Sequence, residues 1–274
     1  MAQHAEFVDR QILGELTSIV SAAAAAILSV VRAGALDTRS KDDRTPVTAA
    51  DHAAQGVILA GLARVLPGVP VVSEEASTQP AHLGDTFILV DPLDGTREVV
   101  AGRDEFTVNV AVIADMAPRL GVVAAPAQGL IWRGIVGKGA ERLALAPGEP
   151  AERARELRAI RTRPCPEAGM IATLSRSHLD PQTEALLARL PISERLACGS
   201  AVKFCRLAEG IADVYPRLST TCEWDVAAGH AVLLAAGGSV TAPGEVPIRY
   251  GRSDFRIPAF IAWGDPAAAK RWHI

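Results

Sequence analysis

The stretch FILVDPLDGTREVVAGRDEFTVNVAVI, residues 87–113, decides the fold that this sequence predicts. Its first part, Phe87–Val90, is short and fully apolar, which is typical of a buried strand. The run stops at a polar turn, where Pro92 cannot donate to a sheet ladder and Gly95 permits a tight backbone. A second strand follows, because apolar residues alternate along 106–113. The stretch therefore predicts two strands of one sheet, joined through a polar segment.

Two carboxylates, Asp91 and Asp94, lie at the end of the first predicted strand. Open α/β sheets bind ligands at such strand ends. Thr96 adds a hydroxyl at the start of a short predicted helix, whose free N–H groups suit an anion. Taken alone, the two acids are equally consistent with an Asx turn between strands. Their role therefore depends on the other acids of the chain.

Three further carboxylates lie at predicted element boundaries. Asp51 follows Thr48 in the pattern of a helix-start capping box, Glu74 follows a short predicted strand at 69–72, and Asp225 begins an alanine-rich helix. Capping is the structural alternative for Asp51 and Asp225, and a solvated loop is the alternative for Glu74. Brought together with the first two acids, these groups would stay ionised only with cations present. Oxygen ligands at this density select Mg²⁺ or Mn²⁺ with a substrate phosphate, as in phosphoryl transfer.

Composition narrows the class of protein. The chain has 274 residues, 49% of them hydrophobic, which is enough for one large domain or two closely packed ones. A net charge of -3 and an aromatic content of 4% argue against a nucleic-acid partner. The four cysteines form no CxxC pair, so we expect reduced and mostly buried thiols in the cytoplasm.

The remaining pattern predicts helices and strands in alternation, without a secretory signal at the N-terminus. The apolar run 19–31 is too short to span a bilayer, so we expect a buried helix over 7–32 and no transmembrane segment. A stretch at 146–163 that is rich in Pro, Glu and Arg predicts a division into halves 1–155 and 156–274. The other expected helices are 48–65, 181–190, 199–210 and 224–236, and the other expected strands are 120–125, 130–136, 170–174, 211–215 and 259–263.

Several motifs give the chain a resemblance to a known family. Through DPLDGT and WDVAAGHAV it resembles the lithium-sensitive, magnesium-dependent phosphatase superfamily of the inositol monophosphatases and fructose 1,6-bisphosphatases. Within that superfamily it looks like a 3'(2'),5'-bisphosphate nucleotidase of the bacterial CysQ type. The segments that carry this resemblance are PVTAAD (46–51), SEEAS (73–77), VDPLDGTREVV (90–100), EFTVNVAVI (105–113), SRSH (175–178), GSAVKFC (199–205), YPR (215–217) and WDVAAGHAV (224–232).

The resemblance implies an α/β (α+β) fold, a layered α/β/α/β/α sandwich, and a magnesium centre of roughly two to three ions, with Mn²⁺ as a substitute. It also implies that Asp51 and Thr96 form a pair that positions and activates the nucleophilic water. This pairing is chemically reasonable, because the carboxylate orients the hydroxyl while a metal lowers the pKa of the water. The metal ligands implied are Glu74, Asp91, the Leu93 carbonyl, Asp94 and Asp225.

The resemblance places the nucleotide against both halves of the chain, with most metal ligands in the N-terminal half. Lys203 and Arg217 supply cations suited to a second phosphate, although ordinary surface charge is the alternative for both. His178 is a nucleotide contact or a surface histidine beside a helix. The substrate-binding residues implied are Glu74, Leu93, Asp94, Gly95, Thr96, His178, Gly199, Ser200, Lys203, Arg217 and Asp225.

The leading hypothesis is hydrolysis of adenosine 3',5'-bisphosphate (PAP) to AMP and phosphate in sulfur assimilation. The related 3'-phosphosulfate (PAPS, giving APS) is a further candidate substrate. An inositol-1-monophosphatase is the alternative, followed by a non-catalytic phosphate-binding module, which would require a lost ligand. The resemblance also predicts a cytoplasmic monomer or homodimer, and it allows peripheral attachment to the cytoplasmic face of the inner membrane.

Overall fold

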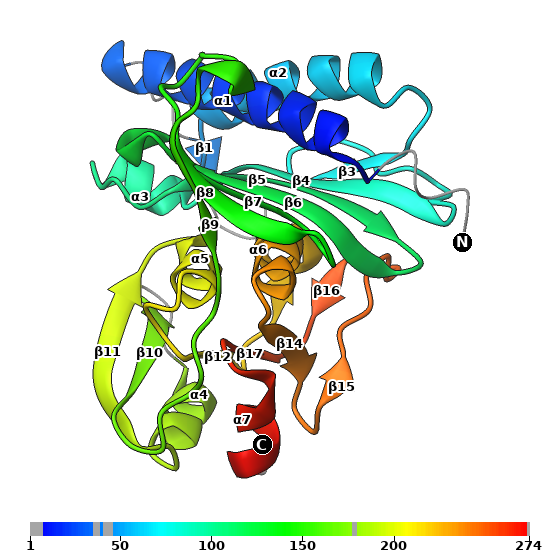
Figure 1. Ribbon diagram of the computed structural model, residues 1–274. Helices are drawn as coiled ribbons and strands as arrows, with labels where there is room; N and C mark the ends of the chain where they lie inside the picture. The colour runs from blue at the N-terminus through cyan, green and yellow to red at the C-terminus, as the bar shows by residue number, and fades with distance from the viewer. Residues whose placement is uncertain (1–7, 35–38, 41–45, 177–179, 273–274) are drawn as a thin grey trace.

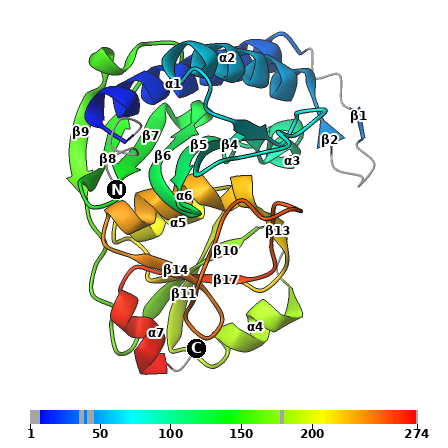
Figure 2. The same cartoon turned by 90° about the vertical axis from the view of Figure 1, so that its right-hand side faces the viewer.

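The computed structural model describes residues 8–34, 39–40, 46–176 and 180–272, which form stacked layers of helices and sheets (Figure 1). Helices α1 and α2 cover one sheet, α5 and α6 lie between the two sheets, and α4 and α7 lie on the far side of the second sheet (Figures 1 and 2). This is the layered α/β/α/β/α order expected from the sequence. The helices are α1 (Arg10–Arg32), α2 (Ala49–Val65), α3 (Thr96–Val100), α4 (Pro181–Leu187), α5 (Val202–Ala208), α6 (Glu223–Ala235) and α7 (Pro266–Trp272).

The first large sheet has seven strands among the described residues, in the order of the chain from β3 to β9. Neighbouring strands are antiparallel except β3 and β4, which are parallel. The expected pairing of the strands at 120–125 and 130–136 is confirmed. The strands are β3 (Val71–Ser73), β4 (Thr86–Asp94), β5 (Thr107–Ala114), β6 (Ala117–Ala125), β7 (Leu130–Ile135), β8 (Gly139–Ala144) and β9 (Arg155–Ile160).

The second large sheet has six described strands in the order β11-β10-β12-β17-β14-β15. Its parallel pairs, β10 with β11 and β10 with β12, place the C-terminal ends of these strands on the edge that faces the first sheet. Two small pairs, β1 with β2 and β13 with β16, complete the set. These strands are β10 (Met170–Ser175), β11 (Ile192–Cys198), β12 (Val214–Arg217), β14 (Ser239–Ala242), β15 (Val246–Pro247), β17 (Phe260–Trp263), β1 (Arg39–Ser40), β2 (Pro46–Val47), β13 (Thr221–Cys222) and β16 (Arg256–Ile257).

Alternation along β4 and β5 divides their side chains between two cores. Phe87 and Leu89 belong to the core shared with α5 and α6, whereas Ile88 and Val90 belong to the core under α1 and α2. Strand β5 is buried along its whole length because helices cover both faces of the sheet. Asp91 lies in the covered part of β4, three residues before its end, and is only 1% exposed.

Helix α1 shows how the first layer is attached. It begins after Asp9, whose carboxylate accepts a hydrogen bond from the Ile12 N–H at 2.7 Å. By length and composition α1 would suit a membrane span, and it is longer than the apolar run counted from the sequence. In this structure, however, its apolar side packs against α2 and β6, and Leu16, Val20 and Ile27 are completely buried.

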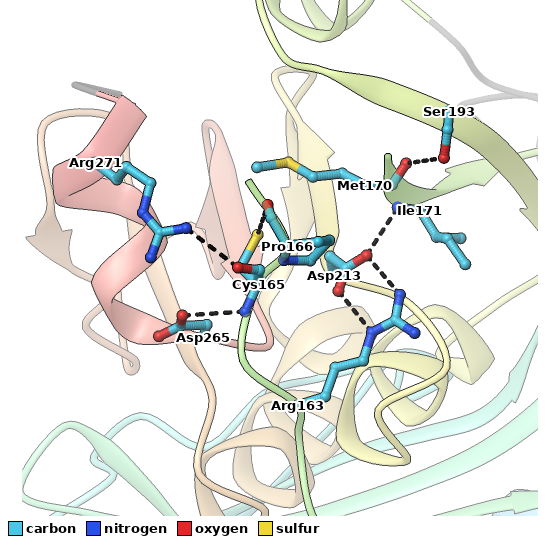
Figure 3. A network of polar contacts seen from close by, with 9 residues as sticks. All are labelled: Arg163, Cys165, Pro166, Met170, Ile171, Ser193, Asp213, Asp265 and Arg271. Atoms are coloured by element: carbon cyan, nitrogen blue, oxygen red, sulfur yellow. Dashed lines mark hydrogen bonds and ion pairs between the residues drawn. The ribbon is translucent and has the colours of Figure 1, made fainter. Parts of the chain in front are cut away.

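The segment that joins the two sheets is anchored by a buried carboxylate (Figure 3). Asp213, whose side chain is fully buried, accepts two hydrogen bonds of 2.8 Å from Arg163 and a third, also 2.8 Å, from the Ile171 N–H. The predicted division between residues 155 and 156 falls at the start of β9, which pairs with β8 in the first sheet. The division itself stays a prediction.

Some element boundaries differ from those predicted. The helix expected at 199–210 begins only at Val202, because the preceding residues form a loop held by contacts from the first half. The strand expected at 211–215 lies at Val214–Arg217. Strands β8, β9 and β11 and helix α7 were not predicted. Strand β11 is a largely exposed edge strand, so its sequence lacks a clear apolar pattern.

Candidate active site

An acidic cluster brings together side chains that are distant in the sequence. Glu74 follows β3, Asp91 lies within β4, and Asp225 lies in the first turn of α6. One ligand oxygen from each of these side chains lies within 4.8 Å of the others. The structure therefore brings together three of the acids that the sequence singled out, from segments separated by 134 positions between Asp91 and Asp225.

The backbone at the end of β4 directs the chain toward the acidic cluster. The register between β4 and β5 shifts between Asp91 and Asp94, so the strand bulges at Pro92 and Leu93. Gly95 then adopts a left-handed conformation with φ of 95°, and a Cβ there would lie 2.5 Å from Ser200 Oγ. Only glycine fits this turn, which directs the chain into α3 beside the cluster.

Electrostatics within the cluster favour a bound cation. Burial, reinforced by the charges of Glu74, Asp94 and Asp225, raises the pKa of Asp91 well above its usual value. Burial and the neighbouring Asp225 raise the pKa of Asp94 to about 7, although Lys203 acts in the opposite direction. These carboxylates therefore cannot all be ionised together unless a positive charge compensates them.

One oxygen of Asp91 points to the same conclusion. Its Oδ1 accepts a hydrogen bond from the Leu93 N–H at 3.0 Å, which is the Asx turn expected as the structural alternative. Its Oδ2 is buried and has no hydrogen-bond partner. A buried carboxylate oxygen without a partner is costly, and a hard divalent cation is the ligand that would satisfy it among neighbouring carboxylates. The residues present therefore suit a magnesium or manganese centre.

Asp51 makes the hydrogen bonds that both of its interpretations require. Its Oδ2 accepts from the Thr48 N–H at 2.8 Å and from Thr48 Oγ1 at 2.7 Å, which completes the capping box of α2. Its Oδ1 accepts from Thr96 Oγ1 at 3.1 Å, across a sequence separation of 45 residues. Thr96 Oγ1 also lies 3.3 Å from the Leu93 carbonyl. Because each oxygen serves a different partner, capping fixes the carboxylate that orients the Thr96 hydroxyl.

Asp225 divides its oxygens in a similar way. Its Oδ2 accepts from the Cys222 N–H at 3.1 Å and from the Thr221 hydroxyl, which caps α6. These caps leave Oδ1 for a cation. Asp51 thus caps α2 and contacts Thr96 in the cleft lining, and Asp225 caps α6 and lines the cleft itself, so the capping and functional interpretations do not compete.

Lys203 and Arg217 are two of the cationic side chains that line the same cleft, which has a volume of about 260 Å³. Lys203 is buried, and its Nζ donates to the carbonyls of Ser200 at 2.7 Å and Cys198 at 3.3 Å. The Arg217 side chain interacts with Tyr215, and its Nε is buried without a hydrogen-bond partner. The cleft is lined by Glu74, Asp91, Leu93, Asp94, Gly95, Thr96, Arg97, Glu98, Ser175, Arg176, Gly199, Ser200, Lys203, Phe204, Tyr215, Arg217, Asp225, Val226 and Phe260.

The structure describes two of the three remaining residues that were predicted to bind the nucleotide. Gly199 and Ser200 line the cleft, but the Gly199 N–H donates to Glu105 and the Ser200 hydroxyl lies 2.8 Å from the Asp94 carbonyl. Both groups therefore hold this loop in place. His178 lies outside the described residues. The assignments of these residues stay predictions.

Sequence reasoning missed several residues of the cleft. Tyr215 packs edge-on against Phe204 and Phe260, with ring centroids 5.1 Å apart in each pair. The Lys203 ammonium lies 5.3 Å from the centre of the Tyr215 ring. In sequence these aromatic residues resemble ordinary strand and core positions, and the place of β12 in the fold brings Tyr215 to the cleft. Arg176, which follows the strand β10, was also missed, although its place at a strand end was a usable signal.

Comparison with known proteins places the chain in a family. The model of the inositol monophosphatase family matches residues 9–273. A 3'(2'),5'-bisphosphate nucleotidase CysQ of Escherichia coli K12 is 40% identical over 228 residues, which cover 82% of this chain and 88% of that protein. The CysQ nucleotidase of Buchnera aphidicola is 35% identical over 202 residues, covering 73% and 72% of the two chains.

Solved structures agree with the fold. The crystal structure of CysQ from Bacteroides thetaiotaomicron, a bacterial member of the inositol monophosphatase family, matches with a TM-score of 0.77 and 34% identity. The match covers 91% of this chain and 95% of that one. The inositol monophosphatase of Anabaena has a TM-score of 0.74 at 22% identity, covers 96% and 94% of the two chains, and supports the fold alone.

Proposed function

The chain belongs to the inositol monophosphatase family, and from that we propose that it is a Mg²⁺-dependent phosphatase that hydrolyses adenosine 3',5'-bisphosphate to AMP and phosphate. The observation that carries the proposal is the shared cleft: the acidic cluster, with its unpartnered Asp91 oxygen, lines the same cleft as Lys203 and Arg217. The cluster suits the metal and the reacting phosphate, whereas the two cations suit a second phosphate. A substrate with two phosphates uses both sides.

The acidic residues would hold the metal. Glu74, Asp91 and Asp225 supply carboxylate oxygens from three elements, and Asp94 and the Leu93 carbonyl extend the set along the bulge. A divalent cation bound there polarises the phosphate oxygens and lowers the pKa of a water molecule. Mg²⁺ is the natural occupant for an all-oxygen set, and Mn²⁺ shares its ligand preference.

Asp51 and Thr96 are the residues that orient the nucleophile. Since Thr96 Oγ1 donates to Asp51 Oδ1, its lone pairs are free to accept a proton from the attacking water. A bond forms between the water oxygen and phosphorus, and the bond from phosphorus to the 3' oxygen breaks. One water proton passes through the Thr96 hydroxyl to Asp51, and the departing 3' oxygen takes a proton from a solvent water molecule to become the hydroxyl of AMP. Asp51 then returns its proton to the hydroxide that is left. By family resemblance, the N–H groups of Gly95 and Thr96 hold the phosphate.

A panel of substrates tests the function. Phosphate release is measured with Mg²⁺ for adenosine 3',5'-bisphosphate, its 3'-phosphosulfate analogue, inositol 1-phosphate and fructose 1,6-bisphosphate. We expect the highest kcat/KM for the bisphosphate nucleotide, and for that activity to be lost with chelator and inhibited by Li⁺. A preference for inositol 1-phosphate would support the inositol monophosphatase alternative. No release from any substrate would support a non-catalytic phosphate-binding module.

A further inference from the structure

One contact between the two halves borders the cleft. Glu105 lies two residues before the start of β5, Arg176 directly follows β10, and Gly199 directly follows β11. A single oxygen of Glu105, Oε2, accepts hydrogen bonds from Arg176 Nε at 3.2 Å, from Arg176 Nη2 at 2.7 Å and from the Gly199 N–H at 3.1 Å. Arg176 also donates to the Ala197 carbonyl at 3.1 Å. Glu105 therefore ties the ends of β10 and β11 to the first half.

Main-chain contacts reinforce this connection. The Ser200 hydroxyl lies within hydrogen-bond distance of two carbonyl oxygens, that of Asp94 at 2.8 Å and that of Glu105 at 3.2 Å. Ser200 has a φ of 50°, which a residue other than glycine adopts only when its surroundings hold it there. A Cβ on Gly199 would lie 2.4 Å from the Glu105 carbonyl oxygen, and one on Gly95 would lie 2.5 Å from Ser200 Oγ. The two segments therefore pack so closely here that neither glycine could carry a side chain without displacing the other segment.

The same loop carries one of the two cations. Lys203 Nζ donates to the Ser200 carbonyl at 2.7 Å and to the Cys198 carbonyl at 3.3 Å, so its position follows the position of this loop. On the other side of the contact, Asp94 lines the same cleft as the acidic cluster and lies next to the turn at Gly95. The contact thus connects the segment that suits the metal with the segment that suits a second phosphate.

From this geometry we propose that Glu105 is a positioning residue that sets the distance between the sites for the two phosphates. The inference rests on the proposed function, because it assigns one phosphate to the acidic cluster and the other to the cationic side. Glu105 acts through the loop at Gly199 and Ser200 and touches neither phosphate. It therefore determines how well a substrate with two phosphates fits, and it matters less for a substrate with one.

A plain structural ion pair would behave differently. The Glu105 and Arg176 side chains are 27% and 42% exposed, and exposed pairs contribute little to stability. A pair that only joined two surface segments would affect all substrates alike. The chain offers a matched control in Glu184 and Arg195, which are joined at 2.7 Å, are both 45% exposed, and lie outside the lining of the cleft.

The test compares Glu105→Ala, Glu105→Gln and Glu184→Ala with the wild type on adenosine 3',5'-bisphosphate and adenosine 3'-monophosphate. We expect Glu105→Ala to raise KM for the bisphosphate by about 10-fold or more, the size of a lost charge-assisted contact. KM for the monophosphate should rise by no more than about fivefold, which is the size of an exposed ion pair. Glu105→Gln keeps an oxygen that accepts from Arg176 and Gly199, so it should recover part of the loss.

Each result has a definite consequence. Equal losses on the two substrates, or a loss no larger than that of Glu184→Ala, would overturn the positioning role. Loss of the bisphosphate activity through kcat alone, with KM unchanged, would also overturn it, since the site spacing would then not govern binding. A wild type that does not hydrolyse the bisphosphate would overturn the proposed function itself. That result is separate, because it is seen before any variant is compared.

Discussion

The two hydroxyls that share Asp51 allow its two roles to be separated. Thr48 Oγ1 donates to Oδ2 at 2.7 Å and Thr96 Oγ1 donates to Oδ1 at 3.1 Å. Thr48→Val and Thr96→Val each remove one hydroxyl and keep a β-branched side chain. We predict that Thr48→Val mainly lowers stability, whereas Thr96→Val mainly lowers kcat.

The structure gives the magnitudes. Thr48→Val removes the bond to Asp51 and the bond of 3.1 Å that Thr48 Oγ1 accepts from the Ala50 N–H, but the Thr48 N–H still donates to Asp51. Loss of such a cap costs about 1 kcal/mol, or about 2–4 °C in Tm for a chain of this size. Thr96→Val removes the hydroxyl that orients the water, and kcat should fall by about 10²–10⁴.

Two measurements on both variants decide the matter. Thermal unfolding without divalent cations gives the Tm of each variant, and phosphate release at saturating Mg²⁺ and adenosine 3',5'-bisphosphate gives kcat. A Thr96→Val enzyme that keeps kcat within about tenfold of the wild type would refute the role of the hydroxyl. A Thr48→Val enzyme that loses as much kcat as Thr96→Val would show that the capping bond and the catalytic bond cannot be separated.

Four further outcomes are expected. Arg217→Ala should raise KM for adenosine 3',5'-bisphosphate by roughly 10- to 150-fold through loss of a charge-assisted contact, and have much less effect on adenosine 3'-monophosphate. Equal effects would assign this arginine to the reacting phosphate or to the fold. Asp91→Asn should abolish Mg²⁺-dependent turnover and also the rise in Tm on adding Mg²⁺; near-normal turnover would remove this carboxylate from the mechanism. Arg163→Ala should lower the free energy of unfolding by about 1.5–3 kcal/mol in denaturant titration, because the fully buried Asp213 loses the charge-assisted hydrogen bonds of an arginine that is itself 40% exposed; a change below about 1 kcal/mol would contradict this. Burial lowers the pKa of His230 to about 3. Below its unfolded value of about 6.5, only the unfolded chain takes up the proton, so stability should fall by up to about 1.4 kcal/mol per pH unit as pH decreases. Replacing His230 with Asn should flatten that slope, and an unchanged slope would contradict the assignment.

Local features of the sequence were read correctly because they depend on near neighbours. The alternation along 106–113 predicted a strand, and the Thr48–Asp51 spacing predicted a capping box that the structure shows. The left-handed backbone of the DPLDGT turn favours glycine at position 95, and that preference is visible in the sequence. These predictions involve residues within a few positions of one another, where spacing largely determines geometry.

The site itself required more than spacing. The sequence suggested that the acids belong together, but the arrangement of Glu74, Asp91 and Asp225 around a common point depends on the pairing of β3 with β4 and the packing of α6. The partners of Glu105 were not predicted, because Arg176 and Gly199 lie 71 and 94 residues away. Contacts at such separations leave no periodic signal in the chain.

What the sequence determined by itself is therefore the set of chemical groups and the local backbone that presents them: carboxylates at strand ends and helix starts, a glycine turn and a capping box. The tertiary structure decided which oxygen of each carboxylate is used. Asp51 caps α2 through one oxygen and meets Thr96 through the other, and the cap of Asp225 likewise uses one oxygen. Capping is a local interaction, so sequence predicts it. The second partner comes from a distant segment, and only the packing of the sheets and helices brings it within hydrogen-bond distance.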